Sequence, residues 1–199
     1  MNPMKRDIQL VVEDELSGIV LRKLVEEFGN GLSVHNVFLM KGFGKIKTGI
    51  PRFKNASRAV PHIVLTDLDR ALCAPSLMRD WDVDEGAKDF LFRIAVREVE
   101  AWLLADREGF SEYLNIPLVK IPQHPEQEND PKQTLFNLVR KCKKRRLVEE
   151  LVPAVGSCAS IGPLYNMRMG AYVRDNWNVQ RALMHSDSLD RAVKRISAF

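Results

Sequence analysis

The chain has 199 residues, of which 45% are hydrophobic and 28% are charged, and this is enough apolar material for one sizeable core and a small second lobe. A formal net charge of +4 favours weak attraction to polyanions without establishing that the protein binds nucleic acid. Three cysteines that lack C-x-x-C spacing argue against a disulfide framework or a structural zinc site. No apolar run of about 18 residues and no signal-peptide pattern occurs, so we expect a cytoplasmic protein that does not enter a membrane.

The first half of the chain alternates predicted strands and helices. Short apolar, β-rich runs predict four strands, at residues 8–12, 33–39, 62–66 and 90–96. Apolar residues at helical spacing predict a helix over 16–28, which ends at a Gly-Asn-Gly stretch. Residues 41–49 contain three glycines and three lysines, and they are interpreted as a mobile basic loop over a phosphate site or as an ordinary exposed connection. A short helix is expected over 52–59, and a loop is expected after residue 66.

The second half of the chain is predicted to be mainly helical. After residue 96 the composition changes from β-branched and aromatic residues to Ala, Leu and Glu, which marks a switch from strand to helix. Helices are also expected over 133–139 and 186–196. The expected organisation has three parts: an α/β core over 1–116 with a mostly parallel sheet flanked by helices, an irregular connector over 117–131, and a helical extension over 132–199 that packs on the core.

Acidic residues follow two of the predicted strands. Glu13 comes after the first strand, and Asp67 and Asp69 come after the third. Because the carboxyl ends of parallel strands share the edge where open α/β sheets bind ligands, we expect these carboxylates to converge there. A set of carboxylate oxygens suits Mg2+ or Mn2+ better than zinc. The pattern therefore predicts a metal site for phosphoryl transfer or phosphodiester cleavage.

Two further acids, Glu98 and Glu100, follow the fourth predicted strand. Glu100 is a candidate for a further catalytic acid or metal ligand, and Glu98 is a weaker one. A simpler interpretation applies to all of these acids, because carboxylates after strands often cap the next helix or form turns. The sequence leaves both interpretations open.

The order of these motifs resembles a Toprim-type fold, in which a glutamate after the first strand and a later Asp-x-Asp bind divalent metal. The stretches Val-Val-Glu-Asp-Glu-Leu-Ser, Leu-Thr-Asp-Leu-Asp and Arg-Glu-Val-Glu-Ala-Trp-Leu-Leu-Ala-Asp are similar to short Toprim-like proteins of bacterial anti-phage loci. These proteins resemble the nuclease half of OLD-family (overcoming lysogenization defect) proteins. Asp-Pro-Lys at 130–132 and Gly-Pro-Leu-Tyr-Asn at 162–166 also suit that family, so the resemblance covers most of the chain.

The resemblance implies a Mg2+- or Mn2+-dependent nuclease that cleaves DNA or RNA in phage defence. It implies that Glu13, Asp67 and Asp69 hold the metal and that Glu100 joins them in the catalytic set. It also implies a separately encoded ATPase of the ABC or AAA type as a partner, and a homodimer as one option for assembly. The chain departs from related nucleases, which often have a glycine just after the first-strand glutamate and an acid four residues beyond it. Asp14 and Ser17 stand at those positions.

Basic side chains are candidates for a nucleic-acid track. They are Lys45, Lys47, Lys132, Lys143, Lys144, Arg145 and Arg168. The densest run, at 141–146, is first interpreted as a solvated helix end, where cations are favourable without any ligand.

Two other functions also fit the sequence. A non-catalytic subunit would use a Toprim-like scaffold to bind nucleic acid or a sensor protein. A primase-like or phosphatase-like enzyme would share the metal site and act on nucleotides or small phosphoesters.

Overall fold

The computed structural model describes residues 5–84 and 87–199, and the chain divides into two compact units. Unit 1 contains the described chain up to Val96 together with Ser188–Phe199, and unit 2 contains Arg97–Asp187. This division differs from the expected one, which placed the end of the core at residue 116 and the C-terminal helix in an extension. One contact that brings the C-terminal helix into unit 1 is the hydrogen bond from the Val96 amide to the Ser188 hydroxyl oxygen, at 3.2 Å.

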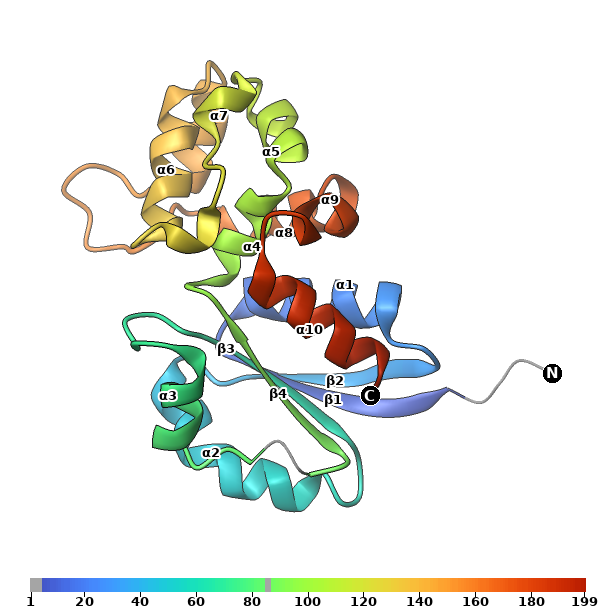
Figure 1. Cartoon of the computed structure of the whole chain (residues 1–199). Helices are drawn as coiled ribbons and strands as arrows, with labels where there is room; N and C mark the ends of the chain where they lie inside the picture. The colour runs from blue at the N-terminus through green and yellow to red at the C-terminus, as the bar shows by residue number, and fades with distance from the viewer. Residues whose placement is uncertain (1–4, 85–86) are drawn as a thin grey trace. The chain divides into compact units, whose positions relative to one another are not determined.

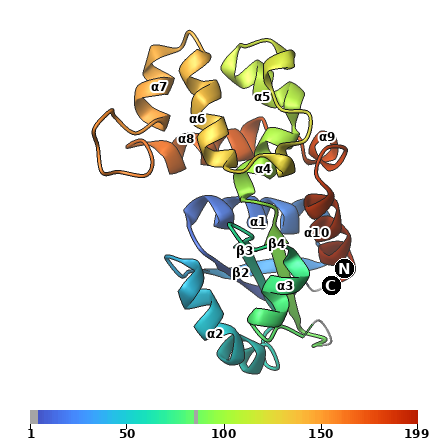
Figure 2. The same ribbon diagram turned by 60° about the vertical axis from the view of Figure 1, so that its left-hand side comes forward.

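Unit 1 is built on a four-stranded, fully parallel sheet. Its strands are β1 (Arg6–Val12), β2 (Leu32–Leu39), β3 (His62–Asp67) and β4 (Phe90–Ala95), in the spatial order β2-β1-β3-β4. One face is covered by α1 (Glu15–Phe28) and α10 (Asp187–Ser197), and the other by α2 (Phe43–Ala56) and α3 (Ala74–Asp80) (Figures 1 and 2). The expected α/β class, a Rossmann-like parallel sheet flanked by helices, is confirmed. The helical character of the C-terminal region is confirmed as well.

The strand order creates a topological switch point between β1 and β3. From β1 the chain moves outward to β2, and it then crosses back over β1 to form β3 on the other side. The helix α1 follows β1 and α3 follows β3, and these two helices cover opposite faces of the sheet. The connections therefore leave the two central strands in opposite directions. The carboxyl ends of the strands at such a switch point are where sheets of this class bind ligands.

Two segments that were expected as loops form helices instead. The interpretation of residues 41–49 as a loop is wrong, since α2 begins at Phe43 and carries Lys45 and Lys47 on its first turns. The loop expected after residue 66 contains the helix α3. The other expected strands and helices are confirmed to within two residues at their ends, except the helix expected over 52–59, which overlaps only the end of α2.

Packing explains why α2 forms despite its glycines. Ile46, Ile50 and Phe53 lie at helical spacing and are at most 4% exposed within the core cluster of unit 1. Burial of this face outweighs the low helix propensity of Gly44 and Gly49. At Gly49 a Cβ atom would lie 2.5 Å from the Phe53 ring, so this glycine serves helix packing rather than a loop.

Unit 2 consists of helices and short turns. Its elements are α4 (Val99–Ala105), α5 (Arg107–Leu114), η1 (Leu118–Lys120), η2 (Pro125–Gln127), α6 (Pro131–Lys141), α7 (Arg145–Leu151), α8 (Tyr165–Asp175) and α9 (Val179–Leu183). Trp102 and Trp177 are buried in its core, where the Trp177 indole nitrogen donates to the Trp102 carbonyl at 3.2 Å. Asp106 is fully buried and accepts two hydrogen bonds from the Arg181 guanidinium, at 2.6 and 3.0 Å. In the described parts of both units, no helix is long and apolar enough to cross a membrane.

Two glycines of α2 provide a test of this helix and its packing. A methyl group at Gly44 would meet nothing within 4 Å, so Gly44→Ala should raise the free energy of unfolding by roughly 0.5–1 kcal/mol through helix propensity. Gly49→Ala should lower it by about 1–3 kcal/mol, because the Phe53 ring must move. Urea unfolding measures both values. A similar effect of the two substitutions would contradict the placement of this helix.

Candidate functional site

Glu13 is the first residue after β1, and its carboxylate is tied to the end of β3. Its Oε1 accepts hydrogen bonds from the Thr66 hydroxyl and from the Asp67 backbone amide, the latter at 3.2 Å. The pairing of Val11 with Val64 in adjacent parallel strands brings these residues together. Among the described residues no group donates to Glu13 Oε2, so this oxygen is available for a further ligand.

The two aspartates lie at the same edge. Asp67 is the half-buried last residue of β3, and Asp69 is exposed two residues later. Asp69 has a φ of 49°, in the left-handed region that few residues other than glycine adopt. Lys41, which follows the neighbouring β2, has a φ of 56°. Such conformations are uncommon and gather at functional sites, so their presence at this edge supports a functional assignment.

Burial raises the pKa of Glu13 above its ordinary value, and the negative charges of Asp69 and Asp14 add to this effect. The hydrogen bonds from Thr66 and the Asp67 amide act in the opposite direction. The Glu13 carboxylate is therefore close enough to those of Asp69 and Asp14 to be repelled by them. A bound divalent cation would relieve this repulsion.

Asp14 and Ser17, the positions that depart from the Toprim pattern, form the N-terminal cap of α1. The Asp14 carboxylate accepts a hydrogen bond from the Ser17 amide at 2.9 Å. This interaction satisfies one of the amides that the first turn of a helix leaves without an intrahelical partner. Asp14 therefore stabilises the start of α1, and its charge acts on Glu13 through space.

The chemistry of this edge fits Mg2+ or Mn2+, because its side-chain donors are carboxylate oxygens. Within residues 5–84 and 87–199, no three His, Cys, Asp or Glu side chains stand close enough to form a metal cage by themselves. Mg2+ is commonly bound by one or two carboxylates, while waters and substrate phosphates complete its shell. Glu13 with Asp67 or Asp69 fits that mode of binding.

Glu98 and Glu100 belong to a polar cluster within unit 2. Glu100 is 1% exposed, and its Oε1 accepts a hydrogen bond from the Tyr165 hydroxyl at 2.8 Å and lies 3.3 Å from the Lys132 ammonium. Glu98 Oε2 accepts a hydrogen bond from the Lys132 amide at 3.0 Å. The structure therefore brings together three stretches of unit 2: the one with Glu98 and Glu100, Asp-Pro-Lys at 130–132, and Gly-Pro-Leu-Tyr-Asn at 162–166. Lys132, a candidate for nucleic-acid binding, lies beside these glutamates.

Burial raises the pKa of Glu98 to about 7, and the charges of Glu100 and Asp130 add to this effect. Lys132 acts in the opposite direction, through its charge and its amide. A carboxyl group with a pKa near neutrality can both donate and accept a proton at physiological pH. The arrangement is therefore suited to proton transfer.

The other basic candidates have different surroundings. Three of them have partners within unit 2: Arg168 with Glu150, Arg145 with Glu149 at 3.0 Å, and Lys144 with the Tyr113 carbonyl at 2.6 Å. Lys143, Lys45 and Lys47 are exposed. Within unit 2, these three side chains of the predicted track therefore have partners in the protein itself.

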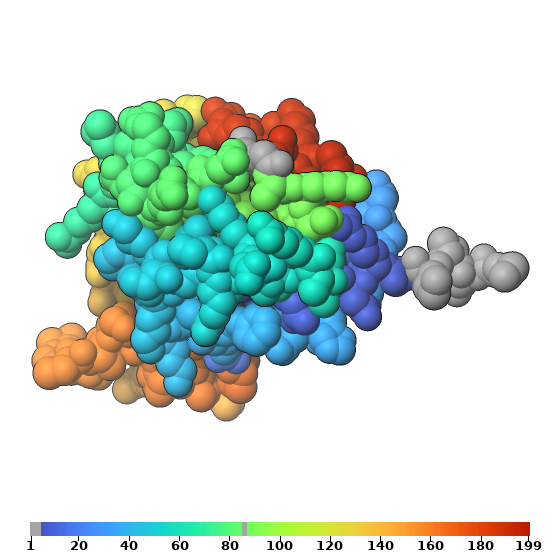
Figure 3. Space-filling view, turned by 90° about the horizontal axis from the view of Figure 1, so that it is seen from below, coloured from blue at the N-terminus to red at the C-terminus, as the bar shows by residue number. Residues whose placement is uncertain are grey.

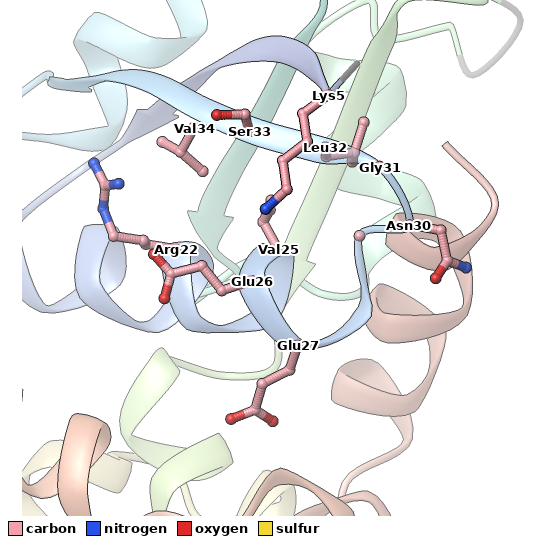
Figure 4. A pocket seen from close by; sticks show the side chains of 11 residues that line it. Lys5, Arg22, Val25, Glu26, Glu27, Asn30, Gly31, Leu32, Ser33 and Val34 are labelled. Carbon is pink, nitrogen blue, oxygen red and sulfur yellow. The ribbon is translucent and has the colours of Figure 1, made fainter. Parts of the chain in front are cut away.

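A pocket of about 420 Å3 lies beside the amino end of β2 (Figure 4). Its lining includes Lys5 before β1 and three charged residues of α1, Arg22, Glu26 and Glu27. Glu13 follows the opposite end of β1, which spans seven residues and therefore about 20 Å. This pocket is separate from the acidic edge.

Two contacts were not predicted from the sequence: that of Thr66 with Glu13 in unit 1, and that of Tyr165 with Glu100 in unit 2. Thr66 carries a hydroxyl and stands just before Asp67 in β3. This position was the sign in the sequence that could have identified its contact with the acidic edge. Tyr165 lies 65 residues from Glu100 in the chain, and only the folded structure reveals this contact.

The raised pKa of Glu98 makes stability depend on pH. Because the pKa of about 7 in the folded protein exceeds the ordinary value of 4.5, the stabilising effect of protonation is complete below pH 4.5 and is lost as the pH rises through 7. Glu98→Gln, which keeps an acceptor for the Lys132 amide, should be more stable than the wild type at pH 8 by on the order of 1–2 kcal/mol after solvent screening.

Urea unfolding at pH 4.5 and pH 8 measures this difference, which should be small at the lower pH. Glu149→Gln removes an exposed acid of unit 2 and is the matched control. The same stability difference at both pH values would contradict the assignment of the effect to Glu98.

Comparison with known proteins identifies a family and no activity. No curated protein and no solved structure matches the chain. Residues 13–162 match the family described as Domain of unknown function (DUF4276). This region begins at Glu13 and includes both acidic clusters. Because the match covers more than half of the chain, the protein belongs to the DUF4276 family.

Proposed function

We propose that this protein is a divalent-metal-dependent nuclease whose metal is held by Glu13 together with Asp67 or Asp69. The observation that carries the proposal is the junction of β1 and β3 at the switch point, where Glu13 accepts a hydrogen bond from the Asp67 amide. Carboxylates delivered by two adjacent strands to this edge suit phosphodiester cleavage assisted by a metal ion.

The residues of this edge have separate tasks in the proposal. Thr66 and the Asp67 amide hold Oε1 of Glu13, so the carboxylate is oriented before a ligand binds. Oε2 of Glu13 and a carboxylate of Asp67 or Asp69 would be the protein's metal donors, and waters and substrate phosphates would complete the shell. When bound, Mg2+ or Mn2+ would supply Lewis acidity to the phosphodiester and to an attacking water. The raised pKa of Glu13 implies that metal binding weakens as the pH falls, because protons compete for the same oxygens.

Glu98 and Glu100 are proposed as a second acidic pair that handles protons. Glu98 has a pKa of about 7, which suits a general acid or base at neutral pH. Glu100 raises that pKa and is itself held by Tyr165 and Lys132. We propose that Glu100 contributes to catalysis through this effect on Glu98.

The proposal extends to phage defence with a separately encoded ATPase of the ABC or AAA type. This extension rests on the resemblance of the motifs around Glu13, Asp67 and Glu98 to Toprim-like proteins of defence loci. The main rival is a non-catalytic subunit with the same fold. The lack of a cage of three metal-binding side chains among the described residues favours that rival.

The proposal predicts cleavage of plasmid DNA, single-stranded DNA or tRNA that requires Mg2+ or Mn2+ and stops in EDTA. Glu13→Gln and Asp67→Asn should each lower the rate by about 100-fold or more, because each removes a metal donor. Asp7→Asn removes an exposed acid at the start of β1 and should keep the wild-type rate. Gel assays of the purified chain, alone and with a candidate ATPase, measure these rates.

Thermal unfolding tests the metal site independently of cleavage. Saturating Mn2+ should raise the Tm of the wild type and of Asp7→Asn, and should have little effect on Glu13→Gln. Absence of both cleavage and a metal-dependent shift would contradict the proposal and favour the non-catalytic subunit.

A further inference from the structure

We infer that a surface at the start of α2 binds a single-stranded polynucleotide and leads it to the acidic edge of the sheet. This surface consists of Lys41, Phe43, Lys45 and Lys47 and is called the α2 platform below. Delivery of the strand to the acidic edge rests on the proposed nuclease function, whereas binding of the strand to the α2 platform does not.

The segment around α2 is basic and has no compensating acid. Residues 41–58 contain six Lys or Arg and no Asp or Glu, although the whole chain has 30 basic and 26 acidic residues. Lys41, Lys45 and Lys47 are exposed, and no ion pair among the described residues involves them. Arg168, by contrast, is paired with a glutamate. Concentrated positive charge without such partners is suited to a row of phosphates.

The α2 platform starts beside Glu13. The Lys41 amide donates to the Glu13 carbonyl at 2.8 Å, and the Met40 amide donates to the Val12 carbonyl at 2.9 Å. The residues that follow β1 and β2 therefore run side by side. Figure 3 shows α2 in cyan across the surface of unit 1, with the green segment that contains α3 beside it. A polymer bound along α2 would reach the acidic edge at the start of this helix.

Phe43 gives the α2 platform an exposed aromatic face. This first residue of α2 is 55% exposed and stacks on Trp81, with ring centroids 6.4 Å apart and an interplanar angle of 20°. Trp81 is 8% exposed and packs edge-on against Phe92 at 5.8 Å, so the core holds it in place. An exposed ring that rests on a fixed partner, in the same short segment as Lys41, Lys45 and Lys47, provides what base stacking requires.

This combination favours a single strand over a duplex. In a duplex the bases stack on one another, so a side chain on the outside meets mainly phosphates and base edges. In a single strand every base has a π face that can lie on Phe43 while neighbouring phosphates meet the lysines. DNA and RNA single strands share this chemistry.

The backbone of Lys41 supports a binding role for its side chain. Its φ of 56° lies in a region that glycine adopts at lower cost. A lysine here is unfavourable for folding, and a ligand for its ammonium group would explain its presence. Lys41→Gly should therefore raise the Tm by roughly 2–4 °C while it weakens polynucleotide binding about 3-fold or more.

Fluorescence anisotropy in EDTA, where metal-dependent cleavage does not occur, tests the inference on the full chain. The probes are labelled oligothymidylate, oligouridylate and a blunt DNA duplex of the same length. At least one single strand should bind about 10-fold more tightly than the duplex, and Phe43→Ala should lower that affinity about 10-fold. Lys45→Ala should reduce the slope of log affinity against log salt by about 0.7.

Lys194→Ala is the matched control, because it removes an exposed lysine of α10 on the other face of the sheet. It should leave the affinities unchanged. A preference for oligothymidylate or for oligouridylate would assign the natural polymer to DNA or to RNA, and either supports the inference. Equal binding of the duplex, unchanged affinity in Phe43→Ala, or an equal loss in Lys194→Ala would overturn it.

The two proposals fail in different ways. Metal-dependent cleavage without single-strand preference or an effect of Phe43→Ala would reject the α2 platform and keep the nuclease. Single-strand binding that depends on Phe43, without any cleavage, would reject the nuclease and keep the α2 platform in a non-catalytic subunit.

Discussion

The hydrogen bonds that Glu13 accepts from Thr66 and from the Asp67 amide join the ends of two adjacent strands, and the candidate site depends on this junction. Parallel strands require crossover connections, and the order β2-β1-β3-β4 sends the connections after β1 and β3 to opposite faces of the sheet. The ends of these central strands are thereby left open to a ligand. A carboxylate at this point is held by neighbouring backbone without being enclosed, which suits a group that must be oriented and still accessible.

The parts of the fold with one clear hydrophobic period were predictable from the sequence. The four strands and α1 follow from this pattern, and Glu13 and Asp67 were placed correctly at strand ends. The start of α2 was missed because Gly44 and Gly49 indicate a loop locally, whereas burial of one apolar face determines the outcome. The unit boundary was also placed differently, because the return of α10 to the sheet unit is a contact between distant parts of the chain.

The roles of charged residues depend on long-range partners that composition does not reveal. Lys132 and Arg168 looked like candidates for phosphate binding, yet folding places them beside Glu100 and Glu150. Exposed ion pairs contribute little to stability, but a buried carboxylate such as Glu100 requires compensation of its charge. These cations are therefore explained by the acids of unit 2. The lysines at the start of α2 are not explained in this way, because no ion pair among the described residues involves Lys41, Lys45 or Lys47.

Several features that are unfavourable for folding lie at the carboxyl edge of the sheet and at the adjoining start of α2. Burial and like charges raise the pKa of Glu13, Asp69 and Lys41 have left-handed backbones, and the Phe43 ring is more than half exposed. The buried charge of Asp106 in unit 2 is, in contrast, satisfied by Arg181 and by backbone amides. Each unfavourable feature alone has a local explanation, but no shared packing requirement accounts for all of them. A ligand that carries negative charge, brings or recruits a cation, and offers flat aromatic surface would compensate the charge repulsion at Glu13 and cover the Phe43 ring, and a polynucleotide with a divalent metal ion has all three properties.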